Sequence, residues 1–330
     1  MGTDSFRLTQ GHLQICQTCF FLLNISVKLY VFDNSLRCGP RTRRMPRLDT
    51  THAFFATHPV FTLAALKDHL GASGHDARAT YNRVHYHART GRLVSPGRGL
   101  YAVVPLGAAA ESFAVDPYLM GSQAVPDAVL GMHSALELHG VAYSAFNEVS
   151  AFTTEPREPW TWRGVTYRSL PHPVALRRQH GVHVGTTIMD RSGLRILVTT
   201  LERTLVDVLR APDAAGGLEE VWRSLGSVQY VRLPEVVDYV RALGTGVTAA
   251  RVGLFLERNR HTLGVSDDIL NQLQALVPRS TQYLSRRQRQ AGTLVPRWNL
   301  VVPTHVLDNA WDELAERPTA GEGASITDGP

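Results

Sequence analysis

Apolar and polar positions follow two different patterns along the chain. Between residues 47 and 106, apolar residues recur three times at helical spacing and then alternate at strand spacing around a glycine-rich turn. The expected elements are a helix ending near 57, helices over 63–70 and 76–90, and strands over 93–95 and 100–104. This order predicts a winged helix-turn-helix, whose third helix enters the major groove of DNA while the hairpin flanks it.

The third predicted helix has an apolar face. Its residues at i, i+4, i+7 and i+11 are expected to be core, and they are Ala77, Tyr81, Val84 and Ala88. The opposite face is expected to contact DNA, together with the hairpin tip, through Thr80, Asn82, Arg83, Tyr86, His87, Arg89, Arg92 and Arg98. Arg83 can read guanine and Asn82 can read adenine. The arginines at 89, 92 and 98 suit phosphates, which add salt-dependent affinity.

The pattern changes after the small-residue linker Gly107-Ala108-Ala109-Ala110. Residues 110–305 predict a larger mixed α+β domain, which is expected to fold separately from 47–106. Thr199 and Glu202 have the spacing of a capping box. The expected strands are 149–153, 164–169, 181–189, 194–198 and 297–302, and the expected helices are 128–139 (capped by Asp127), 201–210, 218–225, 234–243, 248–258 and 267–276.

The two ends of the chain differ from this body. All three cysteines fall within residues 1–44, without a second paired spacing that would favour a zinc site. We interpret this segment as a disordered leader or a start-site artefact, with Met45 as the alternative start; a packed element over 20–32 is the competing interpretation. Residues 306–330 are expected to be a C-terminal tail. No export signal is found, so a cytoplasmic protein is expected.

Charge and missing motifs narrow the function. The net charge of all 330 residues is +5. Residues 1–44 and residues 45–106 each carry a net charge of +4, and residues 107–330 carry a net charge of −3. A basic block on an acidic body favours nucleic acid as the partner of one part. Phosphate-binding, nucleophile-elbow and zinc-protease motifs are absent from the sequence. We therefore expect no catalytic site, no metal and no cofactor.

Several ordered stretches resemble the AbiEi family, the antitoxins of abortive-infection toxin–antitoxin systems. The resemblance spans about residues 50–260, and its stretches are Arg89–Leu93, Arg98–Val103, Ser134–Gly140, Thr153-Thr154 and Thr199–Asp207. It implies a winged-helix repressor that binds inverted repeats in its own promoter. It also implies a C-terminal domain that counters a nucleotidyltransferase-like toxin.

Three expectations complete this interpretation. The protein is expected to be monomeric in solution or to self-associate weakly on DNA. No membrane partner is expected, because no apolar run is long enough for a spanning helix. Arg203 and Asp207, spaced i and i+4, are expected to form a structural ion pair. The alternative hypothesis is a winged helix fused to a nuclease or another enzyme domain, although no lysine occurs after Lys67 to complete a nuclease site.

Overall fold

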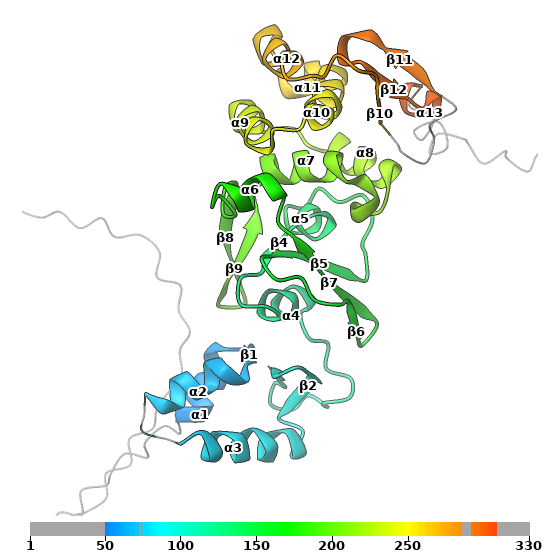
Figure 1. Cartoon of the computed structure of the whole chain (residues 1–330). Helices are drawn as coiled ribbons and strands as arrows, with labels where there is room; N and C mark the ends of the chain where they lie inside the picture. Colours follow the sequence, from blue (N-terminus) through cyan, green and yellow to red (C-terminus); the bar gives the residue numbers. More distant parts are fainter. Residues whose placement is uncertain (1–49, 73, 75, 285–291, 309–330) are drawn as a thin grey trace, which may run out of the picture. The chain divides into compact units, whose positions relative to one another are not determined.

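The structure is a computed structural model that describes residues 50–72, 74, 76–284 and 292–308 (Figure 1). The described residues belong to one compact unit that begins at Leu48. Helices and strands are mixed along this unit, so the predicted α+β class is confirmed. The predictions for residues 1–44 and for the tail beyond 308 lie outside the described residues.

The first part of the unit, which we call the N-terminal module, covers residues 50–103. Its three strands form an antiparallel sheet in the order β1-β3-β2. Phe54, Phe55, Phe61, Leu66 and Leu70 are buried between this sheet and the helices. The elements are α1 (Thr50–Thr57), β1 (Val60–Thr62), α2 (Leu63–Gly71), α3 (Ala77–Arg89), β2 (Leu93–Gly97) and β3 (Leu100–Val103).

Caps and pairing explain these boundaries. The Thr62 side chain caps α2, because it accepts a hydrogen bond from the Ala65 amide at 3.1 Å. Strand β1 is missing from the sequence-based prediction because three residues after a proline are too short for a detectable alternation. It forms because Phe61 pairs with Tyr101 of β3, a contact that only the tertiary structure supplies.

A six-stranded mixed sheet forms the centre of the remaining unit, in the order β6-β7-β5-β4-β9-β8. Its side chains alternate between two apolar clusters, because successive strand residues point to opposite faces. Val129 and Phe152 face the helical side, whereas Leu130 and Ala151 face α4 (Pro117–Gln123). The strands are β4 (Val129–Leu130), β5 (Glu148–Thr153), β6 (Trp160–Trp162), β7 (Val165–Pro171), β8 (Thr186–Arg191) and β9 (Leu194–Thr199).

The predicted helix over 128–139 is wrong in its first half. Val129 and Leu130 form β4, between β5 and β9, and α5 (His133–Leu138) begins only afterwards. A short apolar run buried on both sides cannot be distinguished from a helix by periodicity. Asp127 also caps no helix, because its carboxylate accepts hydrogen bonds from Thr153 and Thr154 at 2.5–2.6 Å.

Three other predicted boundaries need correction. The strand expected over 181–189 begins at Thr186, because residues 181–185 form turns that lead into β8. The strand expected over 297–302 begins at Leu300, since Pro296–Trp298 is a 3₁₀ turn. The helix that begins at Leu201 is capped by Thr200 and not by the predicted box at Thr199. The Thr200 side chain accepts a hydrogen bond from the Arg203 amide.

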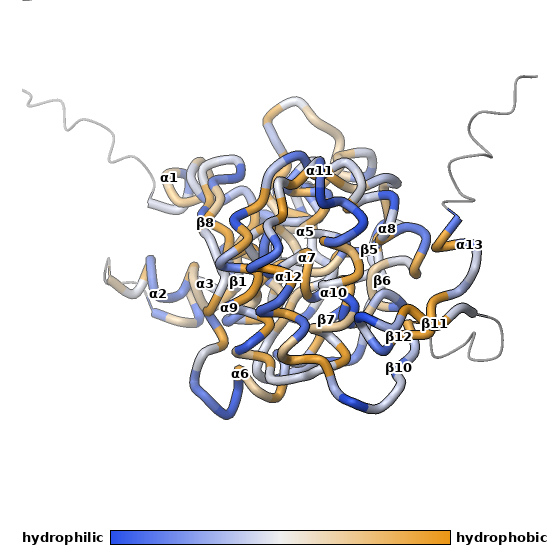
Figure 2. The backbone as a smooth tube through the Cα atoms, turned by 90° about the horizontal axis from the view of Figure 1, so that it is seen from above, coloured by the Kyte–Doolittle hydropathy of each residue, from blue (hydrophilic) through white to orange (hydrophobic). Residues whose placement is uncertain are grey.

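Helices cover one face of the six-stranded sheet and continue into a second, three-stranded sheet in the order β10-β12-β11 (Figure 1). Figure 2 colours this part in alternating hydrophobic and hydrophilic stretches, as amphipathic helices require. Trp298 is fully buried against Gly253, where an added Cβ would lie 2.1 Å from the indole. The elements are α6 (Val174–Arg178), α7 (Leu201–Arg210), α8 (Leu218–Gly226), α9 (Leu233–Leu243), α10 (Gly246–Arg258), α11 (Arg260–Leu263), α12 (Asp267–Gln274), β10 (Gln282–Tyr283), β11 (Thr293–Val295), β12 (Leu300–Val302) and α13 (Thr304–Leu307).

The N-terminal module and the six-stranded sheet share apolar contacts. Val60, Leu100 and Ala102 of the module belong to the same buried cluster as Leu119 and Met120 of α4. Folding of the two parts in isolation stays a prediction, and separation at the linker would expose apolar side chains on both sides. Across the described residues, no helix combines the length and the apolar character needed to cross a membrane.

Candidate nucleic-acid interface

Helix α3 is the element on which most predicted DNA contacts lie. Asp76 begins it, because its carboxylate accepts a hydrogen bond from the Ala79 amide at 2.7 Å. Thr90 ends it, with its amide donating to the Tyr86 carbonyl. The helix carries three arginines and no acidic residue, so its side chains contribute only positive charge.

The buried side of α3 differs from the predicted one. Thr80 and Val84 are 1% and 2% exposed, and the His87 ring lies 5.1 Å from that of Phe55 in α1. The Arg83 guanidinium is half-buried and donates to the Thr51 hydroxyl at 3.1 Å. Thr80 is therefore buried in the module's core, and its predicted place on the exposed face is wrong, whereas Arg83 and His87 are half-buried on the side of α3 that faces α1.

The solvent face of α3 is formed by residues at i, i+4, i+7 and i+11. They are exposed and polar, and they are Arg78, Asn82, His85 and Arg89. Tyr81 and Tyr86 flank this face with 49% and 64% of their surface exposed. Asn82, Tyr86 and Arg89 thus keep the exposure that their predicted role needs. Arg78, Tyr81 and His85 were missed by sequence reasoning.

The error has a physical cause. The sequence pattern predicts Ala77 and Ala88 as core, but both are exposed, because alanine suits a solvent-facing helix as well as a buried one. The true core position at Thr80 is polar, and its hydroxyl is satisfied by donating to the Asp76 carbonyl. The i, i+4, i+7, i+11 series of polar residues on the other side was the signal that could have located the exposed face.

The two arginines after α3 have contacts within the protein. The Arg92 guanidinium donates to the Val104 carbonyl and so ties the start of β2 to the end of β3. Arg98 lies at the hairpin tip with a φ of 59°, and its guanidinium lies 5.7 Å from the centre of the Trp160 ring. Of the three predicted phosphate contacts, Arg89 is thus the one on the exposed helix face.

A cleft runs along the side of α3 that faces α1. It is open, with a volume of about 440 Å³, and several of the predicted contact residues line it. Its lining in the described structure contains arginine and histidine side chains without a carboxylate, from Thr51, His52, Arg83, Tyr86, His87, Thr90, Arg92 and Leu106.

The polar residues of α7 form a second set of contacts, and these are buried. Arg203 and Asp207 are 0% exposed and form the predicted ion pair at 3.2 Å. Arg203 also donates to the Val182 and Val184 carbonyls, at 3.0 and 2.7 Å. The Tyr239 hydroxyl donates to the Asp207 carboxylate at 3.1 Å. Every charged atom of this pair is therefore satisfied inside the protein.

The stretches that carry the family resemblance are joined to one another. His139, at the end of α5, lies 2.7 Å from the Thr199 carbonyl through Nε2. The Arg203 guanidinium also lies 5.3 Å from the ring of Phe152, the residue before Thr153. These contacts link the end of α5 to β9 and link α7 to β5, so the resemblance rests on residues that hold the six-stranded sheet to its helical layer.

Two buried histidines lie beside this framework in opposite electrostatic surroundings. His172 is 1% exposed, and burial followed by the nearby Arg203 charge lowers its pKa to about 4. Burial also opposes the charge on His133, but the carboxylates of Glu137 and Glu220 outweigh it and raise the pKa of His133. Its Nε2 lies 3.1 Å from Glu220. Within the described residues, no group of three or more His, Cys, Asp or Glu side chains could hold a metal ion.

Comparison with known proteins supports the fold. No family model and no curated protein matches the chain. Among solved structures, the crystal structure of the RV2827C protein from Mycobacterium tuberculosis is similar, with a TM-score of 0.50 and 17% sequence identity. The match covers 79% of this chain and 92% of the mycobacterial chain. A likeness at this identity concerns the fold alone.

Proposed function

We propose that the protein is a DNA-binding transcriptional regulator of its own operon and the antitoxin to a nucleotidyltransferase-like toxin. The observation that carries the DNA-binding part is the exposed face of α3, where Arg78, Asn82, His85 and Arg89 stand in one row. The antitoxin part rests on the AbiEi resemblance. We propose no catalytic site for either role.

The arrangement of the N-terminal module supports a winged helix-turn-helix. Its helices and strands follow the order expected for that fold, with the hairpin β2–β3 directly after α3. In this fold the third helix inserts its outer face into the major groove. That face here would be the row from Arg78 to Arg89 rather than the one containing Arg83.

The chemistry of this row suits base edges and phosphates. Asn82 can form a bidentate pair with adenine, and an arginine can do so with guanine. Arg78 and Arg89 lie near opposite ends of the helix, where they can reach the two sides of the groove. His85 lies between them, and its ring is 4.6 Å from that of Tyr81, so both can contribute to the same contact surface.

The experiment that tests DNA binding is a fluorescence anisotropy titration of the full chain with duplex DNA from upstream of its own gene. Saturable binding that weakens steeply with salt, and that exceeds binding to a scrambled duplex of equal length, supports the proposal. Equal and weak binding to both duplexes at low salt would remove its main support.

The antitoxin role is tested by growth. The gene next to this one is expressed alone and together with this protein, and toxicity that is relieved only by co-expression supports the proposal. A catalytically inactive toxin variant is the control for expression burden. If the neighbouring product is harmless, or if co-expression leaves its toxicity unchanged, the antitoxin role is wrong while DNA binding can still hold.

A further inference from the structure

Strand β8 forms one end of the six-stranded sheet, and no other described strand pairs with its outer side (Figure 1). It has six residues and pairs with β9 in an unbroken register, from Thr186 opposite Thr199 to Arg191 opposite Leu194. The strand contains no proline, no lysine and no bulge, which are the features that usually protect an exposed edge from pairing with another strand. β8 is therefore a regular edge whose outer side is open to a further strand.

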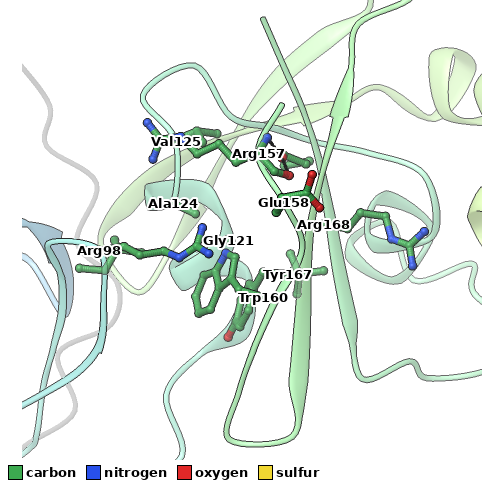
Figure 3. Close-up of a pocket in the computed structure, with 13 residues that line it drawn as sticks. Arg98, Gly121, Ala124, Val125, Arg157, Glu158, Trp160, Tyr167 and Arg168 are labelled. Atoms are coloured by element: carbon green, nitrogen blue, oxygen red, sulfur yellow. Dashed lines mark hydrogen bonds between the residues drawn. The ribbon is translucent and has the colours of Figure 1, made fainter. Parts of the chain in front are cut away.

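The opposite edge of the same sheet is shorter and partly covered. It is formed by β6, which has three residues. The Arg98 side chain extends from the hairpin β2–β3 toward Trp160 of this strand, and its guanidinium lies 5.7 Å from the centre of the Trp160 ring (Figure 3). The difference in length and cover favours β8 as the edge that takes a partner.

The hairpin formed by β8 and β9 determines which backbone groups of β8 point outward. Arg191 and Leu194 close a two-residue turn, so they form a hydrogen-bonded pair, and such pairs then alternate with non-bonded pairs along the strands. The Thr200 amide donates to the Gly185 carbonyl at 2.8 Å, in agreement with this alternation. The odd-numbered residues of β8 therefore bond to β9, and the amides and carbonyls of its even-numbered residues point away from the sheet.

Ile188 lies at the centre of this outward-pointing series. Its side chain is 50% exposed although it is large and apolar. The backbone amides and carbonyls of Ile188 and Asp190 have no hydrogen-bond partner among the described residues. The Thr186 amide is already used, because it donates to the His183 carbonyl at 3.2 Å. The open part of the edge thus runs from the Thr186 carbonyl to Asp190.

We propose that β8 docks against β8 of a second copy of this chain, antiparallel and about a two-fold axis at Ile188. In this register Ile188 lies opposite Ile188 of the second copy, and Asp190 lies opposite Thr186 of the second copy. The Ile188 amide donates to the Ile188 carbonyl of the second copy, and the Asp190 amide donates to its Thr186 carbonyl, each in both directions. The alternation permits these bonds because all three residues are even-numbered.

The side chains of β8 fit a second copy of the same strand. Leu197 of β9 lies opposite Ile188, so the joined sheets would carry one continuous apolar row of these two residues and their copies. Asp190 lies opposite Arg195 of β9 and would meet the Thr186 hydroxyl of the second copy, so no carboxylate faces another carboxylate. A two-fold interface requires a self-complementary surface of this kind. The fit favours a second copy over an unrelated strand as the occupant.

The first test is sedimentation velocity of the full chain over a range of concentrations. We expect a weak monomer–dimer equilibrium, because one pair of strand edges buries little area. Ile188→Lys should abolish the dimer, since it places two positive charges opposite each other. Leu294→Lys is the matched control, because Leu294 is 47% exposed on β11, at an edge of the other sheet. A wild-type chain that stays monomeric up to its solubility limit, or a dimer that Ile188→Lys leaves unchanged, would overturn the proposal.

Disulfide cross-linking tests the register. The three native cysteines are first replaced by serine, and single cysteines are then introduced into β8. Ile188→Cys should form a covalent dimer on oxidation, because directly opposite Cα atoms lie about 5.5 Å apart, within the range of a disulfide. Asp190→Cys alone should not, because its two copies would lie about 13 Å apart along the strands. A mixture of Thr186→Cys and Asp190→Cys proteins should cross-link again. Equal cross-linking by Ile188→Cys and Asp190→Cys would indicate random collision and overturn the register.

The alternative occupant of the edge is a strand of the toxin, and a growth assay separates the two. A monomeric wild type, together with loss of protection in Ile188→Lys but not in Leu294→Lys, would assign the edge to the toxin and overturn the second-copy proposal. A two-fold dimer would place two α3 helices in symmetric positions, as inverted half-sites in DNA require. This consequence rests on the proposed function, whereas the dimer itself is measured without DNA or toxin.

Discussion

Helices α3 and α7 both carry arginine-containing polar motifs, and the protein uses them in opposite ways. On α3, Arg78 and Arg89 extend into solvent. On α7, Arg203 and Asp207 are fully buried, and each is bonded to several partners inside the protein. Similar side chains thus form a surface that is open to a ligand in one helix and a structural joint in the other.

The difference teaches that spacing alone does not assign a role to charged residues. An arginine and an aspartate at i and i+4 form an ion pair on any helix surface, where it contributes little. Burial changes the consequence, because each partner then depends on the other for compensation of its charge. The comparison predicts loss of stability from changes in α7 and loss of DNA binding, with stability kept, from changes on the face of α3.

The largest effect is expected from Arg203→Ala. Removing the guanidinium leaves the Asp207 carboxylate buried and short of a partner, and it leaves two carbonyls unsatisfied. The expected loss is about 3–5 kcal/mol in the free energy of unfolding. Urea denaturation of the full chain measures it. Arg89→Ala is the matched control, with an expected change within about 0.5 kcal/mol, and equal losses in both variants would break the comparison.

A pH effect of intermediate size is expected from His172. Its pKa of about 4 in the folded protein lies below the value of 6.5 in the unfolded chain. The unfolded chain therefore takes up a proton first as the pH falls, and stability is lost between pH 6.5 and 4. From pH 7.5 to pH 5 the expected loss is about 2 kcal/mol. Denaturation of the wild type and His172→Asn at both values isolates this contribution.

His133 is expected to show the opposite dependence of stability on pH. Its raised pKa means that the folded state binds the proton more tightly, so its contribution is present below pH 6.5 and is lost as the pH rises through the folded-state pKa. His133→Gln should therefore cost more stability at pH 6 than at pH 9, again by urea denaturation. A cost that does not depend on pH would show that packing against Phe146, rather than charge, is what His133 contributes.

The smallest stability effect that sharpens the comparison comes from Arg83→Ala. The change removes the hydrogen bond to Thr51 between α3 and α1, which should cost about 1 kcal/mol. Thermal unfolding of the full chain measures it, with Arg78→Ala on the exposed face as the control. A loss of the same size in Arg78→Ala would mean that the exposed row also supports the fold.

The sequence predicted those elements whose signals are local. Helix α7 was placed at its observed bounds, Leu201–Arg210, because an amphipathic run lies between a threonine cap and a proline. Strand β4 was missed because two apolar residues between neighbouring strands have no periodicity of their own. Its identity depends on β5 and β9, which are distant in sequence.

The candidate site was predicted only in part for a similar reason. The sequence predicted the helix and its arginines but not which face of the helix is exposed. Phe55 and Thr51 of α1 determine which side of α3 is covered. The contact of Arg98 with Trp160 joins residues 62 positions apart, so the local pattern of apolar and polar residues cannot predict it. Composition and periodicity therefore located the module, while packing determined which of its residues are available.

The most direct test of the central claim is one anisotropy experiment, in which Arg89→Ala and Arg83→Ala are titrated side by side with the upstream DNA across a salt series. The account predicts that Arg89→Ala weakens binding and lowers the salt slope by about one at an unchanged thermal midpoint. Arg83→Ala should lower the thermal midpoint and keep the salt slope of the wild type. Wild-type affinity in Arg89→Ala, together with lost binding in a stable Arg83→Ala protein, would contradict the account.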